Sequence, residues 1–174
     1  AMVSLAVRMD GGLDAGRINI YLPTQLLTGC AAHFNGPFYG DMSRTNIDFG
    51  KKYNQLLLKR IGRMAVDIVL DTLAGQEVDC ARAIIDILSP SPETGLAGSD
   101  WFKIVQTVCE EKGIQLNEQP IMRTDDEWTS ICYARLIPEI DAPRVLTPDV
   151  LREQATFGVV HKDLMSRKDE LNAL

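Results

Sequence analysis

Residues 16–48, which read GRINIYLPTQLLTGCAAHFNGPFYGDMSRTNID, decide the first part of the fold. The apolar residues alternate over Arg17–Leu22, which predicts a strand because every second side chain of a strand points to the same face. Pro23 cannot donate to a strand ladder, so we expect it to end that strand. Ala31–Phe38 predicts a further strand, interrupted by a Gly-Pro pair, and a polar loop carrying Arg44 follows.

The residues before this stretch predict its partner strand. Val3–Met9 alternates in the same way and is rich in apolar residues. The segment that follows, DGGLDAG at 10–16, contains residues that tolerate positive φ and are common in turns. We therefore expect Val3–Met9 and Arg17–Leu22 to pair as an antiparallel hairpin.

The segment after the loop, Lys51–Leu73, predicts a long helix that ends near Gly75. Its apolar side chains recur at helical spacing and form a wide stripe, so we expect burial on more than one side. The stripe contains Tyr53, Leu56, Leu57, Leu58, Ile61, Met64, Ala65, Ile68, Val69 and Leu73. Arg63 and Asp67 lie four residues apart and are placed to pair on the solvent face.

Two more helices are predicted on either side of a break. Val78–Leu88 has a helical pattern, and a third helix, capped by Ser99 or Asp100, is expected to run to Glu111. The intervening run SPSPETG contains two prolines and a glycine, which cannot continue a helix. We therefore predict two regions, an α+β region at 1–89 and an acidic α+β region at 96–174, with the boundary near 89–98.

The last part of the chain has weaker patterns. Gln119–Arg123 and Trp128–Ala134 are expected to form a short hairpin around the acidic turn 124–127. Thr147 followed by proline predicts a helix that reaches about Gln154, and His161–Leu171 is amphipathic. The fold class predicted for the whole chain is α+β: a small, mostly antiparallel sheet with a long buried helix, then helices and a hairpin.

Charge and cysteine content narrow the class of protein. The net charge is −6, but residues 1–75 hold eight lysines and arginines against six acidic residues, while residues 76–174 hold ten against eighteen. The acidic second part argues against a nucleic-acid surface there. The four cysteines are widely spaced, without a Cys-x-x-Cys pair, so we expect reduced thiols in a cytoplasmic protein and no zinc site.

Other features bear on how the chain is used. We find neither an apolar run of the roughly 20 residues that span a bilayer nor the pattern of a signal peptide, so we expect no membrane partner. The initial Ala-Met resembles a cloning remnant, which leads us to expect a piece of a longer protein. If partner strands are missing from such a piece, an exposed sheet edge favours a homo-oligomer.

A set of motifs in the first half resembles sacsin and its bacterial relatives. These proteins have a heat-shock-chaperone-like ATPase domain of the gyrase, histidine-kinase and MutL superfamily. The resemblance covers residues 3–75, with weaker echoes at 128–138 and 144–152. It is carried by GRINIYLPT at 16–24, Thr28-Gly29, HFNGPF at 33–38, Ser43-Arg44 and YNQLLL at 53–58.

The resemblance implies a region that follows an ATP-binding domain. The family's helical Asn for Mg²⁺ and its Asp-x-Gly-x-Gly loop are absent here, and DGG at 10–12 has the wrong spacing. The chain is therefore expected to be non-catalytic and to bind no cofactor itself, while ATP and Mg²⁺ belong to the preceding domain of the full-length protein. Its partners would be that domain and a protein client. Arg44 is the position that best matches a basic residue reaching toward the γ-phosphate.

Other interpretations remain open on the residues alone. Arg44 could instead pair with Asp41 or Asp48, and the chain could be a stand-alone interaction or scaffold module without a nucleotide. A small enzyme using Arg44, His33 and Asn35 on an anionic substrate would require the three side chains to converge. A Cys30–His33 dyad is disfavoured because an odd offset puts the two side chains on opposite strand faces. The acidic residues at 125–127 are read as a solvated turn, not a cation site.

Overall fold

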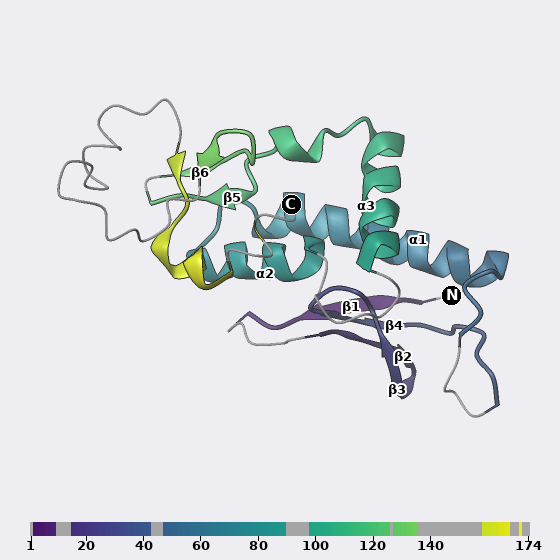
Figure 1. Cartoon of the computed structure of the whole chain (residues 1–174). Coiled ribbons are helices and arrows are strands. Elements are labelled where there is room, and N and C mark those ends of the chain that lie inside the picture. Colours follow the sequence, from purple (N-terminus) through teal and green to yellow (C-terminus); the bar gives the residue numbers. More distant parts are fainter. Residues whose placement is uncertain are drawn as a thin grey trace.

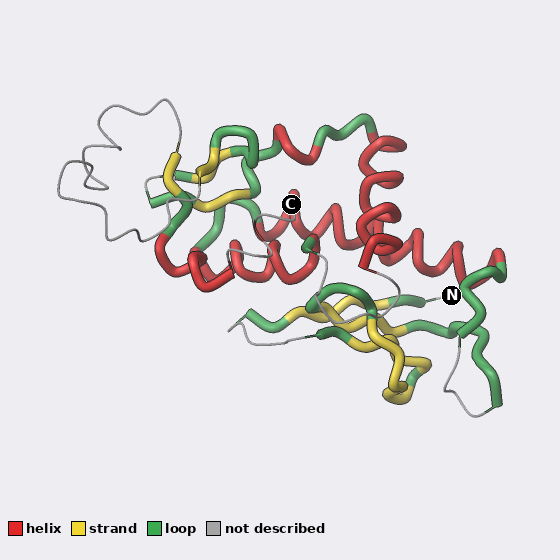
Figure 2. Tube along the Cα trace, in the orientation of Figure 1, coloured by secondary structure: helices red, strands yellow, loops and turns green. Residues whose placement is uncertain are grey.

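A computed structural model of the chain describes residues 2–9, 15–42, 47–89, 98–125, 127–135, 158–167 and 171. The predicted α+β class is confirmed. A four-stranded sheet forms one side of the molecule, helices form the middle, and a part with short strands and loops lies beyond the helices (Figures 1 and 2). The strands of the main sheet are β1 (Ser4–Val7), β2 (Arg17–Ile20), β3 (Leu22–Leu27) and β4 (Ala32–Asn35).

The sheet has the order β1-β4-β2-β3, so the predicted hairpin between the first two strands is wrong. β4 lies between them, antiparallel to β1 and parallel to β2. The reason is burial: Ala32 and Phe34 of β4 are both fully buried, whereas the β1 side chains are only half-buried or exposed. The strand with the most apolar inner face occupies a central position, where helices cover it.

Pro23 does not end a strand, contrary to the prediction. It lies inside β3, opposite Asn19 of β2, and β3 is an edge strand that needs no second set of ladder bonds. The chain reverses at Tyr21, which adopts a positive φ of 58°. The Tyr21 backbone N–H donates to Asn35 Oδ1 at 3.0 Å, and this bond supports a conformation that non-glycine residues rarely adopt.

The helical predictions largely hold. The long helix consists of α1 (Lys52–Asp67) continued by a π-helical segment, η1 (Ile68–Leu73), and Gly75 ends it with a φ of 82°. α2 covers Val78–Leu88 as predicted, and α3 (Gly98–Lys112) ends before Gly113, whose φ is 66°. α1 and α2 lie over one face of the sheet, and α3 stands across α1 (Figure 1).

One part of the predicted apolar stripe on α1 is wrong. Leu57, Leu58 and Ile61 are buried in the core, as expected. Leu56, however, is 63% exposed and Tyr53 is 36% exposed. α1 is covered by the sheet on one side and by α3 on another, so a third face remains uncovered by the described residues.

Trp101 joins the layers of the main core. Its ring packs against Phe34 of β4, with 4.5 Å between the two ring centroids. Its indole N–H donates to the Ile87 carbonyl of α2 at 2.7 Å. Trp101 is fully buried, as suits a large aromatic side chain whose N–H has a partner. The predicted division near residues 89–98 stays a prediction; residues 90–97 lie outside the described residues.

A smaller apolar cluster lies beside α2, apart from the main core. It contains Ala81, Ile85, Met122, Val160, Leu164 and Leu171. The predicted hairpin is present as β5 (Met122–Arg123) and β6 (Trp128–Thr129), followed by a parallel pair, β7 (Ala134–Arg135) and β8 (Gly158–Val159). Two 3₁₀ segments complete the described elements, η2 (Leu116–Glu118) and η3 (Lys162–Arg167). The predicted helix from Thr147 to Gln154 lies outside the described residues.

Two charged residues hold η3 against the small cluster. Asp86 of α2 is fully buried and pairs with Arg167 at 2.5 Å. Leu164 of η3 is also fully buried, where it packs with Ile85 and Met122. The predicted amphipathic segment 161–171 is therefore seen in part as a 3₁₀ turn whose apolar side faces α2. This pair ties η3 to α2 at a buried carboxylate.

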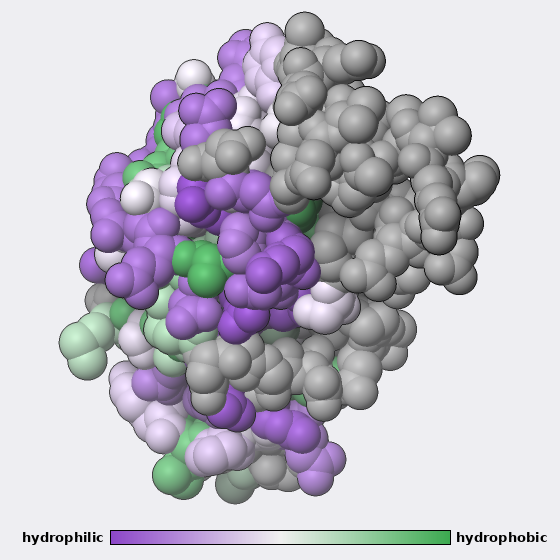
Figure 3. All heavy atoms as spheres, turned by 90° about the vertical axis from the view of Figure 1, so that its left-hand side faces the viewer, coloured by the Kyte–Doolittle hydropathy of each residue, from purple (hydrophilic) through white to green (hydrophobic). Residues whose placement is uncertain are grey.

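The surface of this end is mainly polar. Figure 3 shows that the described residues on this face are mostly hydrophilic, with apolar atoms in separate spots. Among the described helices, none combines the length and apolar character required to cross a membrane.

Candidate functional site

The loop between β4 and α1 is held by one buried side chain, Asn54. Asn54 lies in the first turn of α1 and is fully buried. Its Oδ1 accepts the Tyr39 backbone N–H at 2.8 Å, and its Nδ2 donates to the carbonyls of Tyr39 and Asp48, both at 2.9 Å. Both amide protons and the carbonyl oxygen are thus in use, and the two ends of the loop are fixed to the same helical turn.

The base of the loop is closed by backbone pairing and by aromatic packing. Gly40 and Ile47 form an antiparallel bridge, and Ile47 is buried. Phe38 and Phe49 meet in an edge-to-face contact with 6.5 Å between centroids. Gly40 and Ile47 therefore hold the two ends of the loop side by side near the N-terminal end of α1.

Arg44 belongs to the segment 43–46 of this loop, which lies outside the described residues. Its predicted contact with a phosphate and its alternative pairing with Asp41 or Asp48 both stay predictions. The Asp48 side chain accepts the Gly50 backbone N–H at its Oδ1, at 2.9 Å.

Aromatic and cationic side chains gather where the loop meets α1. The rings of Tyr39 and Tyr53 are 5.2 Å apart in an edge-to-face arrangement. Lys51 Nζ lies 5.6 Å from the centroid of Tyr39, within the range of a cation–π interaction. Tyr39 is 60% exposed, so this corner offers a large apolar ring and a positive charge to solvent.

The uncovered face of α1 is hollowed along its length. One hollow of about 530 Å³ follows the N-terminal half, and a second of about 380 Å³ continues toward η1 and shares two arginines with the first. The first is lined by Tyr53, Leu56, Leu57, Lys59, Arg60 and Arg63. The second is lined by Arg60, Arg63, Met64, Asp67, Ile68, Asp71 and Thr72.

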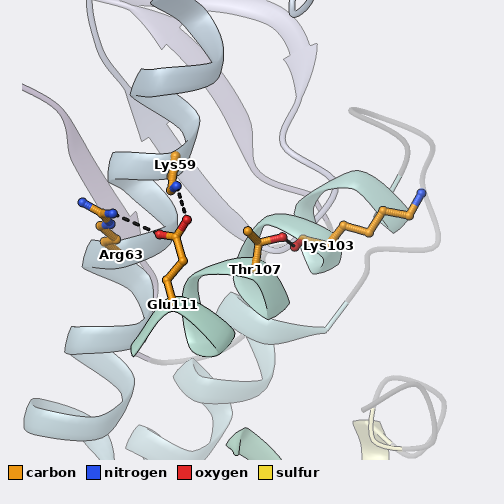
Figure 4. Close-up of polar contacts among 5 residues, drawn as sticks. All are labelled: Lys59, Arg63, Lys103, Thr107 and Glu111. Atoms are coloured by element: carbon orange, nitrogen blue, oxygen red, sulfur yellow. Dashed lines mark hydrogen bonds and ion pairs between the residues drawn. The ribbon is translucent and has the colours of Figure 1, made fainter. Parts of the chain in front are cut away.

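Ion pairs between α1 and α3 border this face. Glu111 of α3 accepts from Lys59 and, at 3.0 Å, from Arg63 (Figure 4). Asp67 of α1 pairs with Lys112 of α3, so the predicted pairing of Arg63 with Asp67 is wrong. Both residues pair with α3 instead, because α3 crosses α1 close enough to reach them.

The same contacts affect the carboxyl group of Glu111. The hydrogen bonds from Lys59 and then from Arg63 lower the pKa of Glu111 below its ordinary value. Farther along α3, the Thr107 hydroxyl donates to the Lys103 carbonyl at 2.8 Å and faces away from α1 (Figure 4). The ion pairs of Glu111 and Lys112 with α1 both lie at the C-terminal end of α3.

The described motif residues outside this loop maintain the fold. Gly16 has no room for a side chain, since an added Cβ would lie 1.8 Å from the Ala32 carbonyl oxygen. The Thr28 hydroxyl is fully buried and lies 2.9 Å from the carbonyl oxygens of both Cys30 and Ala32. Gly16 and Thr28 therefore shape the turn that leads into β4.

The residues considered for an enzyme have structural partners. His33 Nδ1 accepts the Arg17 backbone N–H at 3.0 Å, and Asn35 Oδ1 accepts that of Tyr21, so both side chains hold β4 to β2. His33 is half-buried at the outer face of the sheet and is not enclosed in the core. Burial raises the pKa of the Cys30 thiol to about 12, which leaves it protonated and unsuited to act as a nucleophile.

The acidic turn at 124–127 is held by the Thr124 hydroxyl, which donates to the Glu127 carbonyl at 2.7 Å. Asp126 lies outside the described residues. Within the described ranges, no three His, Cys, Asp or Glu side chains come close enough together to hold a metal ion.

Sequence reasoning missed the uncovered face of α1. The signal was present: Tyr53, Leu56, Arg60 and Arg63 follow helical spacing, and the stretch 51–63 contains five cationic residues and no acidic one. The role of Asn54 was missed as well, since a buried amide in a helix cannot be told from an exposed one by periodicity.

Comparisons with known proteins return no match: no family model, no curated protein sequence and no solved structure is similar to this chain. The resemblance to the sacsin-like proteins therefore rests on the quoted motifs.

Proposed function

We propose that this chain is a non-catalytic, transducer-like region of a chaperone-like ATP-binding protein. In this proposal, a preceding domain of the same protein binds ATP and Mg²⁺. The present region couples the state of that nucleotide to neighbouring domains or to a protein client. The support is the ordered set of motifs over residues 3–75 together with the construction of the loop that contains Arg44.

The observation that carries the proposal is the attachment of this loop to α1. Asn54 binds both loop ends to the first turn of the helix, and the Gly40–Ile47 bridge closes the base. A displacement of the loop would therefore act directly on α1. From there it would reach α3, because α1 is in contact with α3 through Gly62 and through the ion pairs of Glu111.

Arg44 has the chemistry that such coupling needs. A guanidinium stays charged at any physiological pH and can donate two parallel hydrogen bonds to a phosphate. If Arg44 binds the γ-phosphate in the full-length protein, ATP and ADP differ in their contact with this loop. A ligand shifts a conformational equilibrium only through such a differential contact.

The test is ATP turnover by the product of the complete gene. Arg44→Ala is expected to reduce turnover by about 10²-fold, the usual effect of removing one charge-stabilising donor, with Arg44→Lys in between. Arg82→Ala serves as the matched control because Arg82 is a surface arginine of α2 that pairs with Asp79. Residues 1–174 alone are expected to show no turnover. Unchanged turnover in Arg44→Ala would contradict the phosphate role.

A second candidate is a stand-alone protein-interaction or scaffold module with no nucleotide link. The exposed Tyr53 and Leu56 favour it, since these apolar side chains lie on a helix face that the described core does not use. Absence of ATP turnover from the complete gene product would favour this candidate. In either case we propose a cytoplasmic location, which is supported by four cysteines that form no disulfide.

A further inference from the structure

We propose that the uncovered face of α1, from Tyr53 to Arg63 together with Tyr39, is a docking groove for an acidic amphipathic helix of a partner protein. This inference goes beyond the proposed function because it requires neither a nucleotide nor Arg44. It names a surface and the chemistry of its occupant, and it applies whether or not the chain belongs to an ATPase.

The first argument is that apolar residues are exposed where folding does not need them. Leu56 is 63% exposed, Tyr39 is 60% exposed and Tyr53 is 36% exposed. The ring contact between Tyr39 and Tyr53 and the hollow shared by Tyr53 and Leu56 make the three side chains one continuous patch. Tyrosine and arginine, which flank Leu56 here, are among the residues most enriched at the energetic centres of protein interfaces.

The second argument is the charge of this face. Lys51, Lys52, Lys59, Arg60 and Arg63 all fall within a stretch that has no acidic residue. The first turn of α1 contains no carboxylate and receives no capping bond from a described side chain, so the positive end of the helix dipole adds to the same field. Glu111 is paired with two of these cations at the edge of the groove. An acidic partner is the complementary choice.

The third argument is shape. Tyr53, Leu56, Arg60 and Arg63 are spaced by three or four residues, so they form a straight row about 15 Å long. The hollow of about 530 Å³ beside this row matches the ridges-into-grooves packing of a second helix. The second hollow ends at Asp67 and Asp71, so the acidic residues of the partner belong over the N-terminal half of α1.

A protein is favoured over a nucleic acid as the occupant. The chain has a net charge of −6, and the second hollow is lined by Asp67 and Asp71. The net charge and these two carboxylates would repel a polyphosphate backbone. The wall formed by Leu56 and Leu57 also suits aliphatic side chains better than stacked bases.

The experiment uses purified residues 1–174 and a synthetic peptide probe. The peptide is a designed helix with leucines at i, i+3, i+4 and i+7 and glutamates at most other positions, and fluorescence anisotropy follows its binding. We expect a Kd of about 10 μM. A peptide of the same composition in scrambled order, which keeps the charge and loses the apolar stripe, should bind at least about tenfold more weakly.

Paired variants locate the site. Leu56→Ser is expected to weaken peptide binding by about tenfold, and Arg60→Glu by at least as much. Leu22→Ser is the matched control: Leu22 is 57% exposed on β3 and lies outside the groove, so binding should not change. Unfolding curves confirm that each variant is folded.

Any of three results with the peptide would overturn the proposal. They are equal weakening by Leu22→Ser and Leu56→Ser, equal binding of the scrambled peptide, and no binding below about 1 mM. Competition by a 20-nucleotide oligo-dT would also overturn it, in favour of a nucleic-acid surface. The peptide assay is independent of the ATP turnover assay on the complete protein. Failure of this inference is therefore distinguishable from failure of the proposed function.

Discussion

The two faces of α1 differ in a way that separates folding from function. On the inner face, Leu58, Ile61 and Ala65 are enclosed by the sheet and by α3. On the outer face, Leu56 is 63% exposed although it is as apolar as Leu58, and Tyr53 is 36% exposed beside it. The inner residues are explained by burial, which stabilises the fold. The outer residues have no such explanation, and that contrast is the reason for assigning them to an interface.

The largest expected effect is on the inner face. Ile61→Ala removes a fully buried side chain from the main core and is expected to lower the free energy of unfolding by about 2–5 kcal/mol. Urea denaturation measures it. A change below about 1 kcal/mol would mean that the inner face is not the packed centre described above.

A loss almost as large is expected at the loop anchor. Asn54→Leu keeps the branched shape of the side chain but leaves the Tyr39 N–H and two carbonyl groups without their partner, at a cost of about 3 kcal/mol. Proteolysis should then cut the loop between residues 39 and 48 first. A variant as stable as the parent protein, with no new cleavage there, would show that the loop is held by other contacts.

The crossing of α1 and α3 is tested by adding a methyl group. An added Cβ at Gly62 would lie 2.8 Å from Ile104 Cγ2, so Gly62→Ala must displace this side chain of α3 and should cost about 1–3 kcal/mol. Gly50→Ala is the control, since its Cβ would meet only the Asp48 carboxylate, at 3.0 Å. Thermal unfolding distinguishes the two, and equal stabilities would argue against close helix packing.

A smaller, pH-dependent effect is expected at Glu111. Because Lys59 and Arg63 lower the pKa of Glu111 in the folded state, the carboxylate stabilises the protein above its unfolded-state pKa. This contribution is lost as the pH falls through the lowered, folded-state pKa. Unfolding measured against pH should therefore show Glu111→Gln less stable at neutral pH and equal to the parent protein in acid. A difference that persists in acid or grows there would contradict the ion pairing.

The smallest effect on stability is expected on the outer face. Leu56→Ala should change the free energy of unfolding by no more than about 0.5 kcal/mol, because its side chain is already largely in water. Urea denaturation beside Ile61→Ala makes the comparison direct. A loss of 2 kcal/mol or more would place Leu56 in the core and remove the argument for an interface.

Local patterns in the sequence predicted the local structure well. Val78–Leu88 was predicted with its bounds, and Gly75 and Gly113 end helices with positive φ, because helix periodicity and glycine stops depend on nearby residues. The strand order was not predictable in this way. The place of β4 between β1 and β2 depends on which strand the helices cover, and that information is spread along the chain.

The candidate site was predictable only in outline. The motif set marked Arg44 and the helix that follows, but it did not reveal that Asn54 fixes the loop. Tyr53 and Leu56 were assigned to the core because the apolar stripe of α1 is wider than the face that α3 and the sheet cover. Periodicity gives the faces of a helix, whereas only tertiary contacts show which of them stays open.

The central claim is that the loop at the start of α1 responds to nucleotide in the complete protein. Hydrogen exchange of that protein, with and without a non-hydrolysable ATP analogue, tests it most directly. The account predicts altered exchange over residues 39–58 and at the contact of α1 with α3, and unchanged exchange at β5 and β6 as an internal reference. Identical exchange over residues 39–58 at saturating analogue would contradict the claim.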